Sequence, residues 1–117
     1  MYRYDPTKLS SYTATTLAWL GDPAAAGHAR SVIARLTAEP DPGRWPRRVA
    51  AARLDLALAL ATSGEPEGAV LEACQAFESG RVVRSNRWRA REVIAAVADT
   101  GAPVAGLREA YRQMPSW

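Results

Sequence analysis

The pattern of apolar positions is clearest between residues 47 and 80, which read RRVAAARLDLALALATSGEPEGAVLEACQAFESG. Leu54, Leu56, Leu58 and Leu60 lie among alanines, and a second alanine-rich run extends from Gly68 to Phe77. Between them stand Ser63-Gly64 and Glu65-Pro66, which favour a turn. The pattern therefore predicts a helix, a tight turn and a second helix, and this pair cannot bury its apolar faces alone.

The rest of the chain shows the same helical spacing of apolar residues and no signal for strands. Glycine followed by a capping residue and proline separates consecutive helices, as in Gly21-Asp22-Pro23. The fold class that we expect is all-α. The predicted helices span residues 8–20, 23–37, 45–63, 66–79, 85–99 and 103–114.

The three turns form an internal repeat, because Gly21, Gly64 and Gly101 each precede a residue and then a proline. Their separation of about 40 residues is typical of stacked helical hairpins. Alanines 69, 73 and 76, with Val70 and Phe77, are expected to point inward from the fourth helix, since helices cross closely where side chains are small.

The second repeat resembles the tetratricopeptide pattern in Leu56-Ala57, the turn glycine Gly64 and the inter-helix alanines Ala69 and Ala76. The resemblance implies a single domain, residues 1–117, built as a short tetratricopeptide-like solenoid. Its three stacked antiparallel hairpins would span about 7–37, 45–79 and 85–114. A generic α-helical bundle is the alternative.

A second resemblance lies in the stretches WPRRVAAARLDLALAL, GEPEGA, SGRVVRSNRWRAREVIAAV and LREAYR. These look like the C-terminal part of actinobacterial Cro/CI-type (XRE family) helix-turn-helix transcriptional regulators. The resemblance implies a regulatory or partner-binding role without direct DNA contact. Because no DNA-binding motif precedes these helices in the sequence, we expect either a trimmed effector domain or a stand-alone relative.

Composition adds a modest positive charge of +3 that arginine carries in clusters. The candidate anion or partner patch consists of Arg44, Arg47, Arg48, Arg84 and Arg87. The alternative is that these arginines cover alanines on solvated helix faces. One cysteine, and no apolar stretch long enough for a leader or a membrane span, lead us to expect a soluble cytoplasmic protein.

Residues suited to catalysis are sparse. His28 and Cys74 are the only histidine and the only cysteine, and their spacing suggests no pairing with each other or with a third group. A zinc site needs about four ligands. We therefore expect no enzymatic activity, no metal and no cofactor.

Groove residues are the better candidates, because the first helix of each tetratricopeptide hairpin faces a concave surface. Carrying over those positions selects residues from the first, third and fifth helices: Thr15, Trp19, Leu54, Leu58, Trp88, Arg91 and Ala95. Tryptophan anchors beside an arginine could hold a peptide through its carboxylate. The alternative is that both tryptophans pack within or between repeats.

These observations favour a non-catalytic interaction or effector domain related to transcriptional regulators. It would bind a peptide, a protein or a small effector in a helical groove, or mediate dimerisation. A stand-alone helical adaptor or scaffold without a link to transcription is the alternative. Direct nucleic-acid binding is disfavoured, since it requires both arginine clusters on one face.

Overall fold

The computed structural model describes residues 15–17 and 20–115, and this part of the chain contains helices and no strand. Residues 15–17 are helical. The elements that follow are α2 (Ala25–Leu36), α3 (Pro46–Thr62), α4 (Pro66–Glu78), the 3-10 helix η1 (Arg84–Asn86), α5 (Arg87–Asp99) and α6 (Ala105–Arg112). The expected all-α class is confirmed for the described residues.

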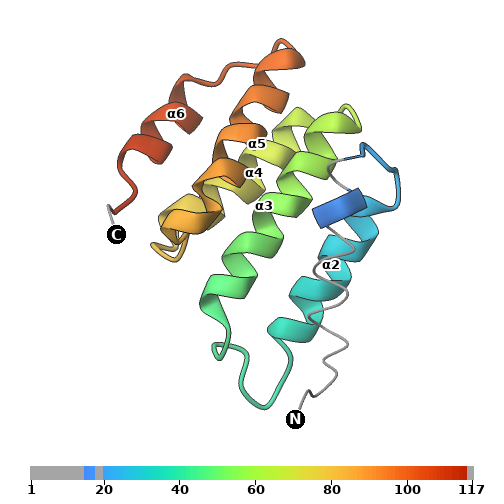
Figure 1. The fold of residues 1–117 in the computed structure, drawn as a ribbon, viewed down its shortest axis with the longest axis vertical. Coiled ribbons are helices and arrows are strands. Elements are labelled where there is room, and N and C mark those ends of the chain that lie inside the picture. Colours follow the sequence, from blue (N-terminus) through green and yellow to red (C-terminus); the bar gives the residue numbers. More distant parts are fainter. Residues whose placement is uncertain (1–14, 18–19, 116–117) are drawn as a thin grey trace.

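Helix α3 is the centre of the structure, because α2, α4 and α5 all pack against it. In Figure 1, α2 and α6 lie on opposite sides of the molecule, with α3, α4 and α5 between them. Leu54 and Ala57 are fully buried, and Leu56 and Leu60 are nearly so. Three packed sides explain why Leu54, Leu56 and Leu60 can all be buried in one helix, while Leu58 is only partly buried.

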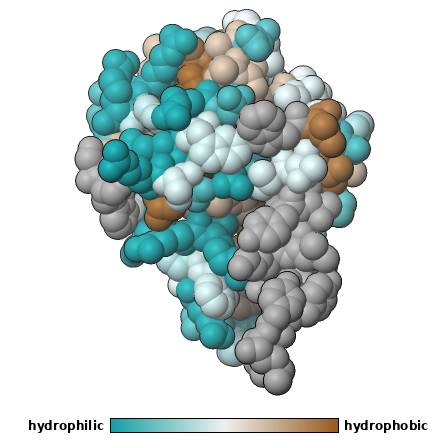
Figure 2. Space-filling view, in the orientation of Figure 1, coloured by the Kyte–Doolittle hydropathy of each residue, from teal (hydrophilic) through white to brown (hydrophobic). Residues whose placement is uncertain are grey.

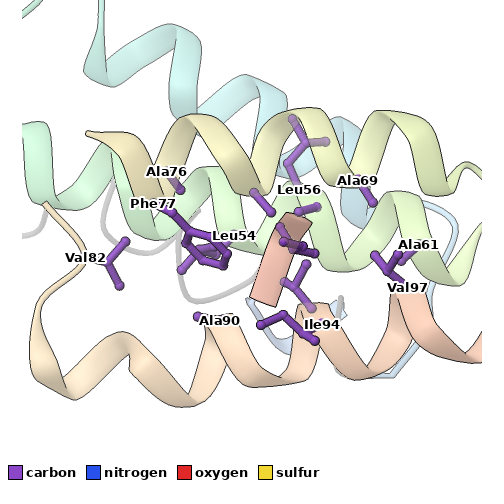
Figure 3. Packing of buried hydrophobic residues seen from close by; sticks show 14 of the residues in the cluster. Leu54, Leu56, Ala61, Ala69, Ala76, Phe77, Val82, Ala90, Ile94 and Val97 are labelled. Carbon is purple, nitrogen blue, oxygen red and sulfur yellow. The ribbon is translucent and has the colours of Figure 1, made fainter. Parts of the chain in front are cut away.

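The core lies between α3, α4 and α5, whose apolar side chains point toward one another (Figure 3). Ala69, Ala73 and Ala76 of α4 are 0% exposed and Phe77 is buried, whereas Val70 is partly buried, so the expected inward face of this helix is confirmed. Small side chains allow α3 and α4 to approach closely.

The turn between α3 and α4 depends on Gly64, which has φ of +81°, a conformation that side-chain-bearing residues rarely adopt. The amide of Glu65 donates to the carbonyl of Leu60 at 2.9 Å. The turn before α2 has the same bond, from the amide of Asp22 to the carbonyl of Leu17, also at 2.9 Å. Two of the three predicted turns therefore share one hydrogen-bonding pattern.

The last helix, α6, packs against α4 and makes a smaller contact with α5. Leu107 of α6 is 2% exposed, and Tyr111 meets Phe77 edge to face with ring centroids 6.1 Å apart. Helix α6 therefore packs mainly against α4, and the loop at Gly101 carries the chain from the end of α5 to this position (Figure 1).

Several predicted boundaries differ from the observed ones. Helix α5 begins at Arg87, because residues 84–86 form a 3-10 turn and not the first α-helical residues; Asn86 makes no side-chain cap bond, and its side-chain oxygen accepts from Arg89 instead. Helix α6 is shorter than the predicted range 103–114. Most of the predicted helix 8–20 lies outside the described residues.

The close approach of α3 and α4 yields a stability prediction. We expect Ala73→Leu to lower the free energy of unfolding by about 1–3 kcal/mol, because the larger side chain has no space between the two helices. Gln75→Leu adds the same side chain at an exposed position of α4 and should change stability by less than about 0.5 kcal/mol.

Urea unfolding followed by circular dichroism measures both variants. Equal effects of the two substitutions would contradict close packing at Ala73.

Candidate functional site

A buried carboxylate lies in the middle of α3. Asp55 is only 6% exposed and is surrounded along the helix by leucine and alanine. A charged group in such a place costs free energy unless it is paired and hydrogen-bonded. The partners of Asp55 therefore show which elements the chain holds together.

Two partners come from distant parts of the sequence. Arg89 of α5 places its Nε 3.2 Å from Asp55 Oδ1. Thr15 donates from its hydroxyl to Asp55 Oδ2 at 2.7 Å, and the same hydroxyl accepts from Arg89 Nη2 at 3.1 Å. We call these three residues the Asp55 cluster. It connects residues 15–17, α3 and α5 through a closed set of hydrogen bonds.

Local contacts fix the position of the arginine. Arg89 Nη1 donates to the side-chain oxygen of Asn86 in η1. The guanidinium group lies over the ring of Trp88, 4.8 Å from its centroid. These contacts hold the guanidinium group against the protein, and the Arg89 side chain is only 19% exposed.

The electrostatic balance at Asp55 is dominated by desolvation. Burial raises the pKa of this carboxyl above its ordinary value of 3.8, while the charge of Arg89 and the hydrogen bonds from Thr15 and Arg89 partly offset the increase. The cluster stabilises the charged form of Asp55 but does not fully compensate for the hydration that the carboxylate loses on burial.

A groove continues along the same faces of α3 and α5, beyond the Asp55 cluster. Leu58 and Thr62 follow Asp55 by one and two helical turns, and Glu92 and Ala96 follow Arg89 in the same way. We call this depression, of about 340 Å³, the α3–α5 groove. Its lining consists of Leu20, Gly21, Leu58, Thr62, Glu92, Ala95, Ala96 and Asp99.

The predicted groove residues are distributed over several environments. Leu58 and Ala95 line the α3–α5 groove, whereas Leu54 is fully buried in the core. Thr15 belongs to the Asp55 cluster, and Trp88 lies beneath the guanidinium group of Arg89. Trp19 lies outside the described residues.

Arg91, predicted beside Trp88 in the groove, is directed toward α6. Its Nη1 donates to the hydroxyl of Tyr111 at 3.4 Å. The arginine that approaches the groove-forming face of α5 is Arg89, and its charge is paired with Asp55. Among the residues that the structure describes, no basic side chain lines the α3–α5 groove.

The arginines of the predicted patch form two groups, at the starts of α3 and α5. Arg44 and Arg48 lie over the ring of Trp45, at 4.7 and 5.3 Å from its centroid, and Arg47 is exposed beside them. The second group packs differently: Arg87 lies over Tyr111 and donates to the carbonyl of Pro115, and Arg84 in η1 is exposed. Each group thus has its own aromatic partner.

The groups suited to catalysis are far from forming a constellation. His28 is exposed on α2. Cys74 of α4 is partly buried, and burial, followed by the charge of Glu78, raises the pKa of its thiol and so lowers its reactivity. Among residues 15–17 and 20–115, no group of three or more histidine, cysteine or acidic side chains is placed to bind a metal ion.

A membrane-spanning element is also absent from the described part of the chain, where every helix is too short or too polar to cross a bilayer.

Sequence reasoning missed Asp55, Arg89 and the groove acids Glu92 and Asp99. Asp55 did carry a signal, because it is the only charged residue between Arg53 and Glu65, within a run of leucine and alanine. A lone acid in such a run points to a buried carboxylate with a distant cationic partner. The choice of Arg89 among five neighbouring arginines has no comparable signal.

Comparison with known proteins adds no relative: no family model, no curated protein and no solved structure matches this chain.

The Asp55 cluster yields a prediction for a double-mutant cycle. Asp55→Leu and Arg89→Met should each destabilise the fold by about 3 kcal/mol, because each leaves a buried charge without its partner. The double variant should be less destabilised than the sum, since it removes both charges. Arg91→Met, at an exposed position, should cost less than about 0.5 kcal/mol.

Chemical denaturation of the four proteins measures the cycle. Strictly additive effects of the Asp55 and Arg89 substitutions would show that the two side chains do not interact.

The raised pKa of Asp55 predicts a pH dependence of stability. The folded state holds this proton more tightly than the unfolded chain, so protonation of Asp55 favours folding. This contribution is complete below pH 3.8 and is lost as the pH rises through the raised pKa of the folded state. Asp55→Asn removes the contribution.

We therefore expect the free energy of unfolding of the wild type, relative to Asp55→Asn, to decrease as the pH is raised from about 4 toward neutrality. Urea titrations of both proteins across this range test it. A relative stability that increases with pH would mean that Arg89 lowers the pKa of Asp55 by more than burial raises it.

Proposed function

We propose that this chain is a non-catalytic interaction domain that binds a peptide or protein segment in the α3–α5 groove. The observation that carries the proposal is the groove itself, which combines an apolar floor with charged and polar edges. Leu58 and Ala96 are partly buried on the floor, and Leu20 is 76% exposed at one wall. A concave apolar surface with a few polar groups is the usual form of a binding site.

The arrangement of helices that we propose is a tetratricopeptide-like stack of three helix pairs. Three features support it: α3 packs beside α5, α4 packs beside α6, and the turns at Gly21 and Gly64 share one hydrogen bond. In such a stack the first helix of each pair faces the concave side. The α3–α5 groove would then be part of that side.

A binding role, and not a catalytic one, is supported by the state of the ionisable groups. Asp55 is fully engaged by Arg89 and Thr15, and His28 is exposed on a different helix. A nucleophile would require a base within hydrogen-bond distance, and the described residues offer none to Cys74.

The regulatory role that we propose rests on the resemblance of residues 45–112 to the effector part of Cro/CI-type regulators. Binding in the α3–α5 groove would then report the presence of a partner or effector to a DNA-binding component. In the alternative, an adaptor, the same groove would join two proteins without a link to transcription. The identity of the bound partner separates these two roles.

Site-specific photo-cross-linking in cells tests the proposal. A photoreactive amino acid at Ala95, which is exposed in the groove, should capture a partner, and the same probe at Arg108 of α6 should not. Thr62→Arg should abolish capture from Ala95 by filling the groove, whereas Gln75→Arg, exposed on α4, should leave it unchanged.

A partner that carries a DNA-binding domain would support the regulatory role, and a partner without one would support the adaptor. Capture that is equal from Ala95 and Arg108, or that survives Thr62→Arg, would overturn the assignment of the groove.

A further inference from the structure

The edge of the α3–α5 groove is acidic, in a chain whose net charge is +3. Glu92 and Asp99 are both exposed and line the groove from α5. Neither carboxylate takes part in a salt bridge with another residue of the described chain. Their charges are therefore available to a ligand that enters the groove.

The arginines that might have neutralised this edge are held elsewhere. Arg89, one turn before Glu92, is paired with Asp55, and Arg91 is directed to Tyr111 on α6. The sequence led us to expect an arginine that holds a carboxylate. The structure reverses the sign of the charge that the groove offers, because the two nearest arginines serve other contacts.

The spacing of the two acids defines the shape of a matching ligand. Glu92 and Asp99 are separated by two turns of α5, which places them about 10 Å apart along the helix axis. Between them lie Ala95 and Ala96, and Leu58 faces them from α3. A peptide in the polyproline II conformation advances about 3.1 Å per residue and has three residues per turn, so side chains three residues apart lie on one face about 9 Å from each other and match this distance.

We propose that the occupant of the α3–α5 groove is a peptide segment in the polyproline II conformation, with two basic side chains three residues apart and an aliphatic side chain between them. The basic groups would meet Glu92 and Asp99, and the aliphatic group would rest against Leu58. This inference rests on the proposed function and names the chemistry of its ligand. An acidic peptide or a nucleic acid would face repulsion at the same edge.

A second copy of the chain is the other occupant to consider, because Arg44 and Arg47 are themselves two basic residues three positions apart. Trp45, between them in the sequence, is 39% exposed. The guanidinium group of Arg44 stacks on the Trp45 ring, 4.7 Å from its centroid. Use of residues 44–47 as a ligand would require Arg44 to leave the Trp45 ring. We therefore assign the groove to a separate partner and treat self-association as an outcome of the test.

Fluorescence anisotropy with three labelled peptides tests the inference. The peptides are identical except for a central Arg-Leu-Ala-Arg, Gln-Leu-Ala-Gln or Glu-Leu-Ala-Glu segment. The wild-type protein should bind the basic peptide most tightly and the acidic peptide least tightly. Its affinity for the basic peptide should fall with added salt, since exposed charges are screened.

Two pairs of substitutions provide the matched comparison. Glu92→Gln with Asp99→Asn should weaken binding of the basic peptide about tenfold, because two ion pairs are lost. Asp41→Asn with Glu78→Gln changes the net charge equally at exposed positions outside the groove lining and should leave the affinity unchanged. Glu92→Arg with Asp99→Arg should reverse the preference toward the acidic peptide.

Equal binding of the basic and neutral peptides, without an effect of the acid substitutions, would overturn the ligand class, and cross-linking from Ala95 would decide separately whether the groove binds a partner. Binding of the acidic peptide in preference to the basic one would do the same. If none of the three binds, the basic ligand is likewise rejected, and cross-linking from Ala95 decides the proposed function separately.

Sedimentation of the wild type covers the remaining outcome. Self-association that the basic peptide competes away and that Arg44→Glu removes would assign the groove to a second copy and overturn a separate partner.

Discussion

The buried charge of Asp55 is the constraint on which the groove-forming part of the structure depends. A carboxylate that is only 6% exposed must find a cation and hydrogen-bond donors, and here they come from α5 and from residues 15–17. Apolar packing alone would tolerate a shift of one alanine-rich helix against another, because small side chains offer few distinct positions. The bonds among Asp55, Arg89 and Thr15 specify one relative position, at a cost in desolvation.

Alanine and the charged cluster make different contributions to this fold. Ala69, Ala73 and Ala76 let α4 approach α3 closely and bury the core that gives the domain its stability. The Asp55 cluster lies at the edge of that core and sets how α5 lies beside α3.

The face of the molecule shown in Figure 2 is largely hydrophilic, with a few separate hydrophobic patches. Exposed Leu20 is notable because it lies at the groove.

Much of the fold could be predicted from the sequence, and the groove only in part. Apolar periodicity and the glycine-proline turns identify the helices, and small residues identify the inward face of α4, because these signals are local. The tetratricopeptide resemblance selected Leu58 and Ala95, and both line the groove. It could not decide that Arg89 turns to Asp55 while Arg91 turns to Tyr111, since a long side chain selects its partner from helices distant in sequence.

We infer that the Asp55 cluster holds residues 15–17 and α5 beside α3 and thereby forms the groove. Amide hydrogen exchange measured by NMR in the wild type and in the Asp55→Leu, Arg89→Met double variant tests it most directly. The amides of Leu20 and Asp22, bonded to Thr16 and Leu17, should lose protection about tenfold or more in the variant, while Ala69 in α4 keeps its protection. Equal changes at all three amides, or no change at Leu20 and Asp22, would contradict the claim.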